Sequence, residues 1–594
     1  MRISKRMNIG TAAVLGGMAL ASAQVIPAIN VHLDKVQNPA YTLKELHPAA
    51  FTPQVGGLAQ LEDGRLVILE FIFAVGDREN TTNIPKKNGT LYIGSNLDAA
   101  DPEQVKLEMV AKDLAEPTGV CVVNGKIYVA EKTQLTEFTL GAPGTMATAR
   151  KITDFTLDPD GQVNFQEYNF GLVHKDGYLY TATGGGVKLG GVSWIDNLAK
   201  LSDTTRSTLL KIKLDGSTKE LVAGGLRAPN GITFGPDGDF WVTDNQGSFL
   251  PSCKLIHIVP GRNYGYTNGP NRFRGMDATL PAVWFPHGEI GKSITNPTYM
   301  KTGAFAGQFL LGDLSQGGMM RAAVEKVNGE WQGSAHSFGG GYAAGIESSV
   351  ELKDGSFVLG GLGRGDNGNW GWLGRLKGLQ RLSPIPGTAN FEMYALRSKA
   401  EGIEIEFTKP VGVGAELPAS YTVFSGSMVP GKLYGEGNMM GKAYITVTGV
   451  KISTDKKRVL LEMDLSAKAK QIVAVKVGAV KSAGGEDVYR PAAWYTLNSL
   501  STTPWLSASR IQARVQGKTA DDILVGRSGA GLAVEVPFAG SHVLTLRNVL
   551  GKALETRTGS GTASYRLGGA GLSQGVYLLD LKVGGQTLRK SVAF

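Results

Sequence analysis

A short two-strand pattern recurs along the first two thirds of the chain and constrains its fold more than any other feature. Each copy starts with an apolar strand, turns at an Asp-Gly or Asn-Gly dipeptide, and returns along a second apolar strand. These dipeptides tolerate the positive φ of a type I′ turn, so each copy predicts a β-hairpin. The full copies span Gly56–Leu69, Thr118–Glu131, Phe170–Thr183, Asn230–Asn245 and Gly345–Gly361, and a degenerate copy without the dipeptide spans Ala306–Val324.

A single hairpin cannot bury both of its faces, so hairpins repeated about every 50–60 residues are expected to stack side by side. Six copies between Tyr41 and Leu382 predict a six-bladed β-propeller, in which each blade is a four-stranded sheet. An array of β-sandwiches is the alternative, but it does not account for the constant hairpin. The 81 glycines among 594 residues agree with many tight turns and exclude a helical protein.

Two linkers after the repeats divide the rest of the sequence into two further β modules. A Pro/Gly-rich linker at 383–390 precedes alternating strands at 391–499, which are typical of an immunoglobulin-like (Ig-like) β-sandwich. A second linker at 500–504 precedes a small β-sandwich at 505–594. We therefore predict an all-β chain with a leader at 1–23, a propeller at 24–382 and these two sandwiches.

The first residues, Met1–Ala23, combine a basic start, an apolar run and an Ala-Ser-Ala ending, which is the pattern of a secretory signal peptide. The apolar run is shorter than the roughly 20 residues of a membrane span, and no later segment is long enough to be one. The formal charge of +9 is spread over the whole chain, which argues against a nucleic-acid partner. The two cysteines, Cys121 and Cys253, allow one disulfide in an oxidising compartment, but two buried free thiols are the favoured expectation.

The densest polar run, Leu226–Tyr266, belongs to the fourth hairpin. It resembles the glucose/sorbosone dehydrogenase family, six-bladed propellers that oxidise sugars with pyrroloquinoline quinone (PQQ) and Ca²⁺. The resemblance covers about Tyr41–Asn498 and implies a sugar or sugar-derived small molecule as partner, with PQQ and Ca²⁺ as cofactors. The family residues kept in the run are Arg227, Pro229, Gly231, Asp237, Gly238, Gly247, Asn263, Tyr264 and Gly265.

In a propeller, strand ends from several blades meet at one mouth of the central channel, where we expect the site. Arg227 offers a fork of donors for a carboxylate or quinone, and His287 with Glu289 forms a His-x-acid pair suited to metal or acid/base chemistry. Their structural alternatives are a salt bridge between blades and a satisfied loop histidine. The candidate cofactor contacts are Arg227, Asn230, Asp244, Asn245, Gln246, Arg321 and Arg364; the candidate metal ligands are Gly247, Ser248 and Tyr264; the candidate catalytic residues are Glu167, His287 and Glu289.

Weaker candidates lie at corresponding places in the fifth and sixth blades. Paired tryptophans suggest a platform for a sugar ring, although packing is the simpler explanation for them. If the site is real, Arg227, Asp244, His287 and Glu347 are expected to converge on one mouth. The weaker candidates are Asp313, Glu347, Asn369, Trp370 and Trp372.

The chain departs from the family pattern at three positions. Gln166 or a neighbour stands where the family has its base histidine, and His174 is displaced from that position by several residues. Ala228 replaces an asparagine that contacts the cofactor. Lys254 aligns near the acid of the calcium loop, where an ammonium group would repel a divalent ion. These departures favour binding or altered chemistry, with Glu167 as the nearest substitute base.

Two other functions remain open. One is a non-catalytic glycan-binding protein. The other follows from the segment Asn230–Asp244, which is similar to calcium-dependent gluconolactonase-like propellers. That resemblance implies that Asn230, Asp244 and an early glutamate, here Glu70, hold a metal that polarises a lactone carbonyl.

The last ninety or so residues resemble the sorting domain of type IX secretion. The motif is carried by Gly575, Val576, Tyr577, Lys590 and Val592. It implies passage across an outer membrane through a dedicated secretion machinery, followed by release or attachment at the cell surface. An ordinary adhesive β domain is the alternative.

Overall fold

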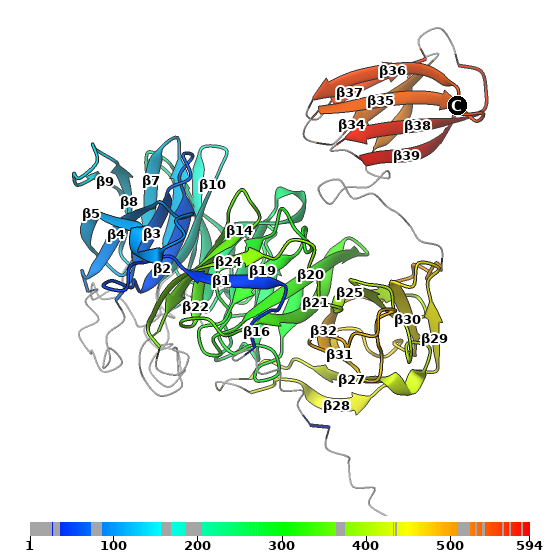
Figure 1. Cartoon of the computed structure of the whole chain (residues 1–594), viewed down its shortest axis with the longest axis horizontal. Helices are drawn as coiled ribbons and strands as arrows, with labels where there is room; N and C mark the ends of the chain where they lie inside the picture. The colour runs from blue at the N-terminus through cyan, green and yellow to red at the C-terminus, as the bar shows by residue number, and fades with distance from the viewer. Residues whose placement is uncertain are drawn as a thin grey trace, which may run out of the picture.

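The structure is a computed structural model whose regular elements are almost all β-strands (Figure 1). Among the residues it describes, no helix is both long and apolar enough to cross a bilayer. The described residues are 26–27, 36–72, 86–155, 168–185, 205–267, 269, 271–363, 375–431, 433, 436–507, 523–528, 531–536, 538, 541–560, 563–568, 572–583 and 586–594.

Six antiparallel blades of four strands each follow one another along the chain. Their strands are consecutive in sequence except in the sixth blade, which takes its outer strand from the N-terminus, and the fifth blade is half of an eight-stranded sheet. From the inner to the outer strand, the first three blades are β2 (Val55–Gln60), β3 (Leu66–Glu70), β4 (Gly89–Ser95) and β5 (Lys106–Leu114); β6 (Gly119–Val123), β7 (Lys126–Ala130), β8 (Gln134–Thr139) and β9 (Thr148–Asp154); and β10 (Asn169–Lys175), β11 (Tyr178–Thr183), β12 (Thr208–Lys213) and β13 (Lys219–Gly224). The other three are β14 (Pro229–Phe234), β15 (Phe240–Asp244), β16 (Cys253–His257) and β17 (Val283–Phe285); β18 (Thr298–Tyr299), β19 (Phe309–Gly312), β20 (Met319–Val327) and β21 (Glu330–Gly339); and β22 (Ile346–Glu351), β23 (Phe357–Leu362), β24 (Lys377–Pro384) and β1 (Tyr41–Glu45).

The ring closes through the N-terminal strand. β1 forms the outer edge of the sixth blade, where Tyr41 pairs with Pro384 of β24. The inner strands contact one another in a closed cycle: β2 lies against β6 and β22, β10 against β6 and β14, and β18 against β14 and β22. The chain is therefore a six-bladed propeller, as the repeated hairpins predict.

The hairpin turns differ in loop length, and only some of them are the predicted type I′ turn. At Asn124–Gly125 and Asp176–Gly177, both central residues have positive φ, between 50° and 81°. The Gly64 turn has a three-residue loop closed by Leu61 and Arg65, with only the glycine left-handed at φ 92°. Either geometry needs the glycine, so the dipeptide predicts the hairpin without deciding its loop length.

The degenerate copy does form two paired strands, but they are not the first two strands of their blade. Its two strands, β19 and β20, are the second and third strands of the fifth blade. The inner strand is β18, which has only two residues and is too short to show an alternating pattern.

A two-sheet sandwich follows the propeller, and its two sheets share one apolar core. One of its sheets is continuous with the fifth blade, because β21 of the propeller pairs with β32 from Gly333↔Thr496 to His336↔Ala493. In order, the sheets are β25 (Met393–Lys399), β26 (Gly402–Phe407), β30 (Arg458–Glu462) and β29 (Gly449–Ile452), and β32 (Ala492–Leu497), β31 (Gln471–Val477), β27 (Tyr421–Ser427) and β28 (Met440–Tyr444).

The propeller and this sandwich also share a hydrophobic core. Trp241 and Trp284 of the fourth blade belong to the same buried cluster as Phe424 and Trp494 of the sandwich. Figure 1 shows the two units in contact along β21 and β32. The propeller and the sandwich are therefore packed and hydrogen-bonded to each other. Strand β24 extends to Pro384, two residues into the predicted linker.

The C-terminal module is a second, smaller two-sheet sandwich with its own core. Two of the sorting-motif residues pair across its last two strands, Tyr577 with Val592. Gly575 and Phe594 exchange backbone hydrogen bonds of 3.2 and 2.9 Å. Its strands are β33 (Leu524–Ser528), β34 (Gly531–Val536) and β37 (Ala563–Leu567), and β36 (Ala553–Ser560), β35 (Ser541–Asn548), β38 (Val576–Val583) and β39 (Gln586–Ala593).

Candidate functional site

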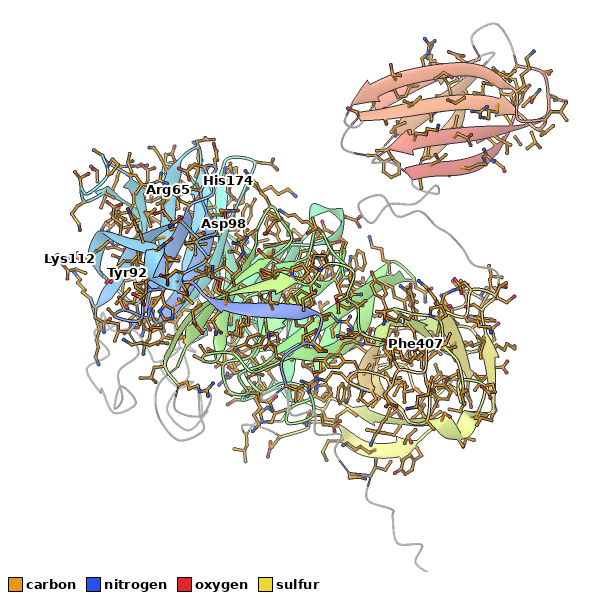
Figure 2. All side chains as sticks on the ribbon, viewed as in Figure 1. Arg65, Tyr92, Asp98, Lys112, His174 and Phe407 are labelled. Atoms are coloured by element: carbon orange, nitrogen blue, oxygen red, sulfur yellow. The ribbon has the colours of Figure 1, made fainter. Side chains whose placement is uncertain are left out.

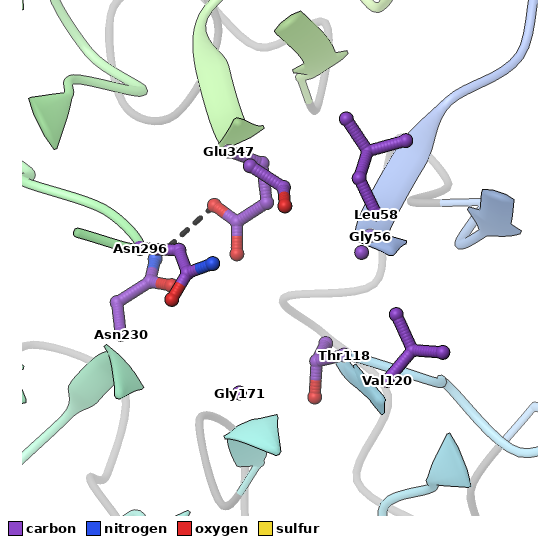
Figure 3. Close-up of a pocket in the computed structure, with 10 residues that line it drawn as sticks. Gly56, Leu58, Thr118, Val120, Gly171, Asn230, Asn296 and Glu347 are labelled. Atoms are coloured by element: carbon purple, nitrogen blue, oxygen red, sulfur yellow. Dashed lines mark hydrogen bonds between the residues drawn. The ribbon is translucent and has the colours of Figure 1, made fainter. Parts of the chain in front are cut away.

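A narrow cavity lies on the propeller axis and is lined by residues from all six blades (Figure 3). It encloses about 270 Å³ of space, including the part that opens to solvent. Three of its wall positions are glycines, and a side chain there would strike the neighbouring blade: a Cβ at Gly56 would lie 2.5 Å from the Pro117 carbonyl oxygen. The lining residues are Gly56, Gly57, Leu58, Thr118, Val120, Gly171, Asn230, Asn296, Glu347 and Ser348.

Glu347 is the one titratable residue among these lining residues. It is 3% exposed, and its carboxyl accepts a 3.1 Å hydrogen bond from the Asn230 amide (Figure 3). Burial raises the pKa of Glu347 to about 8, which the Asn230 hydrogen bond only partly opposes. The Asn296 Oδ1 atom, also in this wall, is buried without a hydrogen-bond partner among the described residues. The channel therefore holds a proton-binding acid beside neutral amides.

An apolar cap lies at the mouth beside this cavity. We use this name for the mutually packed residues Phe71, Tyr168, Phe170, Leu314 and Leu362, which come from four blades and are each less than 8% exposed. Phe71 lies directly against Gly56 of the cavity wall, 2.9 Å from the position of a Cβ there. Hydrophobic side chains from four blades therefore pack together at the mouth, where the sequence predicts the site residues.

The polar residues gather instead at one side of the mouth, in the segment Asp244–Leu250, which we call the site loop. Asp244 is fully buried, and its carboxylate accepts N–H groups from Arg227 and Ala228 at 2.9–3.2 Å. The Lys254 ammonium lies 3.7 Å from the same carboxylate and donates to the Tyr264 carbonyl oxygen. Burial raises the pKa of Asp244 and lowers that of Lys254, and the attraction between the two groups opposes both shifts.

These contacts do not fit the calcium ion that the resemblance implies. The Tyr264 carbonyl, a predicted ligand, already accepts the Lys254 ammonium, and the Gly247 carbonyl accepts the Leu250 N–H at 3.1 Å. Ser248 is 1% exposed. Within the described ranges, no three His, Cys, Asp or Glu side chains are grouped so that they could hold a metal. Lys254 brings a positive charge to the place where a cation would need ligands.

Several side chains predicted to contact the quinone contact other residues of the protein instead. Arg227 is 3% exposed and lies on the Gly247 backbone, where a Cβ would be 1.9 Å from its Nε. The Cys253 thiol lies 2.7 Å from Gln246 Oε1 and 3.3 Å from Asn245 Oδ1. These side chains hold the site loop in shape, and the Arg227 guanidinium lies against the loop backbone instead of facing a ligand at the mouth.

Phe249 in the site loop was not predicted from the sequence. Gly247 and Leu250 exchange backbone hydrogen bonds of 2.9 and 3.1 Å, so Ser248 and Phe249 form the tip of a tight turn. Phe249 has a φ of +64°, at a turn position that glycine normally takes. It is half-buried, and its N–H donates to the Gly431 carbonyl of the sandwich at 2.7 Å. The only sequence signal was an aromatic residue at a turn.

The predicted pair His287 and Glu289 lies at the boundary with the sandwich and not at the mouth. The His287 backbone exchanges two 3.0 Å hydrogen bonds with the Asn438 side chain. Glu289 is 2% exposed; it forms an ion pair with Lys442 and accepts the Trp494 indole N–H at 2.8 Å. Burial lowers the pKa of His287. The described contacts of the pair are with the sandwich, and its catalytic role stays a prediction.

Arg321, predicted as a cofactor contact, also lies at this boundary. It is 1% exposed and forms a 2.8 Å ion pair with Glu392, which is 3% exposed. The same guanidinium donates to the carbonyls of Met393 and Tyr394. Arg321 therefore ties the fifth blade to the first strand of the sandwich.

The remaining candidates are separated or lie outside the described residues. Asp313 accepts four backbone N–H groups at 2.7–3.1 Å and organises its own loop. His174, labelled in Figure 2, lies at the turn end of β10, away from the mouth. Arg227 and Asp244 meet, whereas Glu347 faces the channel with Asn230 and His287 lies elsewhere. Outside the described residues are Glu167, Gln166, Arg364, Asn369, Trp370 and Trp372.

The three residues that the lactonase resemblance implies as metal ligands each have other partners. Asn230 faces the channel and donates to Glu347, whereas Asp244 belongs to the ion pair with Lys254. The third implied ligand, Glu70, accepts a 3.3 Å hydrogen bond from Tyr92 within its own blade. Burial raises the pKa of Glu70.

No protein-family model matches this chain, and neither does any curated protein. Among solved structures, a candidate oxidoreductase (glucose dehydrogenase) from Thermus thermophilus is 18% identical with a TM-score of 0.42, covering 58% of this chain and 99% of that one. A PQQ-bound aldose sugar dehydrogenase from Streptomyces coelicolor is 13% identical with a TM-score of 0.39, covering 58% and 99%. The PQQ domain of a Coprinopsis cinerea pyranose dehydrogenase is 10% identical with a TM-score of 0.40, covering 60% and 98%. At these values the likeness carries no argument about activity.

Proposed function

We propose that this chain is a carbohydrate-binding propeller that works without a calcium–quinone centre. The observation that carries the proposal is the buried ion pair between Lys254 and Asp244, whose N···O separation is 3.7 Å. It supplies an internal cation where the resemblance to sugar dehydrogenases implies calcium. The resemblance of Leu226–Tyr266 to those sugar-directed enzymes supports carbohydrate as the ligand class.

The accessible part of the site loop suits a sugar. Asn245 and Phe249 are the half-buried members of this loop, next to fully buried neighbours. An aromatic ring can cover the apolar face of a sugar, and an amide can hydrogen-bond its hydroxyls. Phe249 also keeps a left-handed backbone that costs about 1–2 kcal/mol in a residue with a Cβ. Strain of this kind is typical of residues kept for function.

Replacing Phe249 with glycine is the test of this proposal. Phe249→Gly is expected to lower the affinity for a bound glycan about tenfold or more, because the ring is lost. The same change should leave the melting temperature unchanged or raise it, because glycine adopts positive φ without strain. Ligands are found on a glycan array, and affinities are then measured by isothermal titration calorimetry of the full chain.

Phe249→Tyr is the matched control and should bind as the parent protein does. Affinity should be equal in EDTA and in Ca²⁺. A glycan array without any hit, or wild-type affinity in Phe249→Gly, would contradict the proposed sugar site. Calcium-dependent ring opening of a lactone by the purified chain would favour the lactonase alternative.

We also propose that the chain is exported and displayed at the cell surface. The support is the leader pattern of Met1–Ala23 and the C-terminal motif around Gly575 and Lys590. The strand order of the middle module agrees with an Ig-like sandwich, which is a common spacer in surface proteins. Fractionation of cells that express the full gene, with and without residues 505–594, tests this location.

A further inference from the structure

Lys254 has surroundings that are unusual for a lysine. Its side chain is 2% exposed, and β16 places it opposite Asp244 of β15 in the sheet register. The ammonium has the Asp244 carboxylate at 3.7 Å, the Tyr264 carbonyl as hydrogen-bond acceptor, and the Trp284 ring centroid at 5.8 Å. A carboxylate oxygen, a backbone carbonyl oxygen and an aromatic face are all groups that attract a cation.

The Asp244 carboxylate needs a counter-charge at this position. It is fully buried and also accepts two backbone N–H groups, from Arg227 and Ala228. The charge of Lys254 attracts it more strongly than the charge of the Arg227 side chain does. A buried carboxylate left without a cation is strongly destabilising. Asp244 in turn joins the end of β15 to the segment before β14, so the charge balance decides whether the site loop keeps its shape.

We propose that Lys254 is the built-in cation of the site loop, and that shortening it turns this place into a binding site for a free cation. The ligand class is a small cation that carboxylate and carbonyl oxygens can hold, either a primary alkylammonium ion or Ca²⁺. In the wild-type chain the tethered ammonium fills the place, so added cations find no site there. The inference concerns the loop's charge balance and does not depend on sugar binding.

The experiment is cation rescue of Lys254→Ala in the full chain. The substitution removes roughly the atoms of propylammonium, so propylammonium chloride is the matched probe and uncharged 1-propanol its control. The variant is expected to melt about 5 °C or more below wild type. Propylammonium or CaCl₂ should recover part of this loss, whereas 1-propanol and NaCl of equal ionic strength should not.

Wild type should show none of these responses. A variant that neither cation stabilises would overturn the proposal. So would a wild-type protein that Ca²⁺ stabilises and whose response disappears in Asp244→Asn. Rescue by propylammonium alone identifies an ammonium-shaped site, and rescue by CaCl₂ alone identifies an oxygen-ligand site; either supports the inference.

A double-mutant cycle keeps the proposal testable if Lys254→Ala does not fold. Lys254→Met and Asp244→Asn each leave one buried group without its partner, and the double variant leaves no charge. The double variant is therefore expected to melt above both single variants. If the melting temperature of the double variant falls below wild type by the sum of the two single decreases, the groups are not coupled. That result would overturn the proposal.

Discussion

Raising the pH from about 5 to about 8 is expected to destabilise the propeller by roughly 3.5 kcal/mol, and Glu347→Gln is expected to remove most of this dependence. The folded protein raises the pKa of Glu347 from 4.5 to about 8 through burial. A folded pKa above the unfolded value means that the contribution is complete below about pH 4.5 and is lost as the pH rises through 8. The other residues lining the cavity carry no titratable side chain that could offset this loss.

Thermal melts across this pH range measure the effect. The control is Glu62→Gln, which removes an acid of the same type from the exposed β2–β3 loop and should keep the wild-type slope. The Asn230 amide donates to the Glu347 carboxyl, so Asn230→Ala should steepen the dependence by removing a partner of the charged form. An unchanged slope in Glu347→Gln would show that this acid does not control the stability of the ring.

Arg321→Met is expected to cost about 3–5 kcal/mol of stability, because it leaves the Glu392 carboxylate buried without its cation. Both partners are almost fully buried, and the guanidinium also bonds the Gln308 side chain at 2.6 Å. Because the propeller and the sandwich share a sheet and a core here, both should unfold at a lower temperature together. Calorimetry of the full chain measures the loss and shows whether the two transitions stay coupled.

The matched control is Arg262→Met. Arg262 forms an ion pair with Glu330 of the neighbouring blade, but its side chain is 36% exposed and that of its partner 53%. An exposed pair contributes about 0–1 kcal/mol, so this variant should melt close to wild type. If Arg321→Met loses sugar binding but keeps wild-type stability, Arg321 acts in ligand binding and not in stability.

The propeller could be predicted from the sequence because its signal is local. An Asn-Gly or Asp-Gly dipeptide between two apolar runs decides a hairpin within fifteen residues, as at Asn124–Gly125. β18 was missed because two residues cannot show a period. The pairing of β21 with β32 was missed because it joins residues about 160 positions apart, and hydrogen-bond register at that distance leaves no trace in a single sequence.

The candidate site could be predicted only in part. Lys254 was singled out because its charge contradicts a calcium loop, and the structure places it beside Asp244. The ion pairs of Arg321 and Glu289 were not predicted, because a charged side chain has the same sequence signal in a ligand site and in a buried ion pair. Their partners, Glu392 and Lys442, lie in a different structural unit. Only the packing of the sandwich on the propeller brings them together.

Reconstitution with PQQ and Ca²⁺ tests whether the propeller lacks a calcium–quinone centre. Purified full chain is incubated with both, passed through gel filtration, and examined for quinone absorbance and for sugar-dependent reduction of an artificial electron acceptor. We expect neither retained quinone nor turnover, because Lys254 and Asp244 satisfy each other where a calcium–quinone centre would need open ligands. Stoichiometric quinone with calcium-dependent turnover would contradict it.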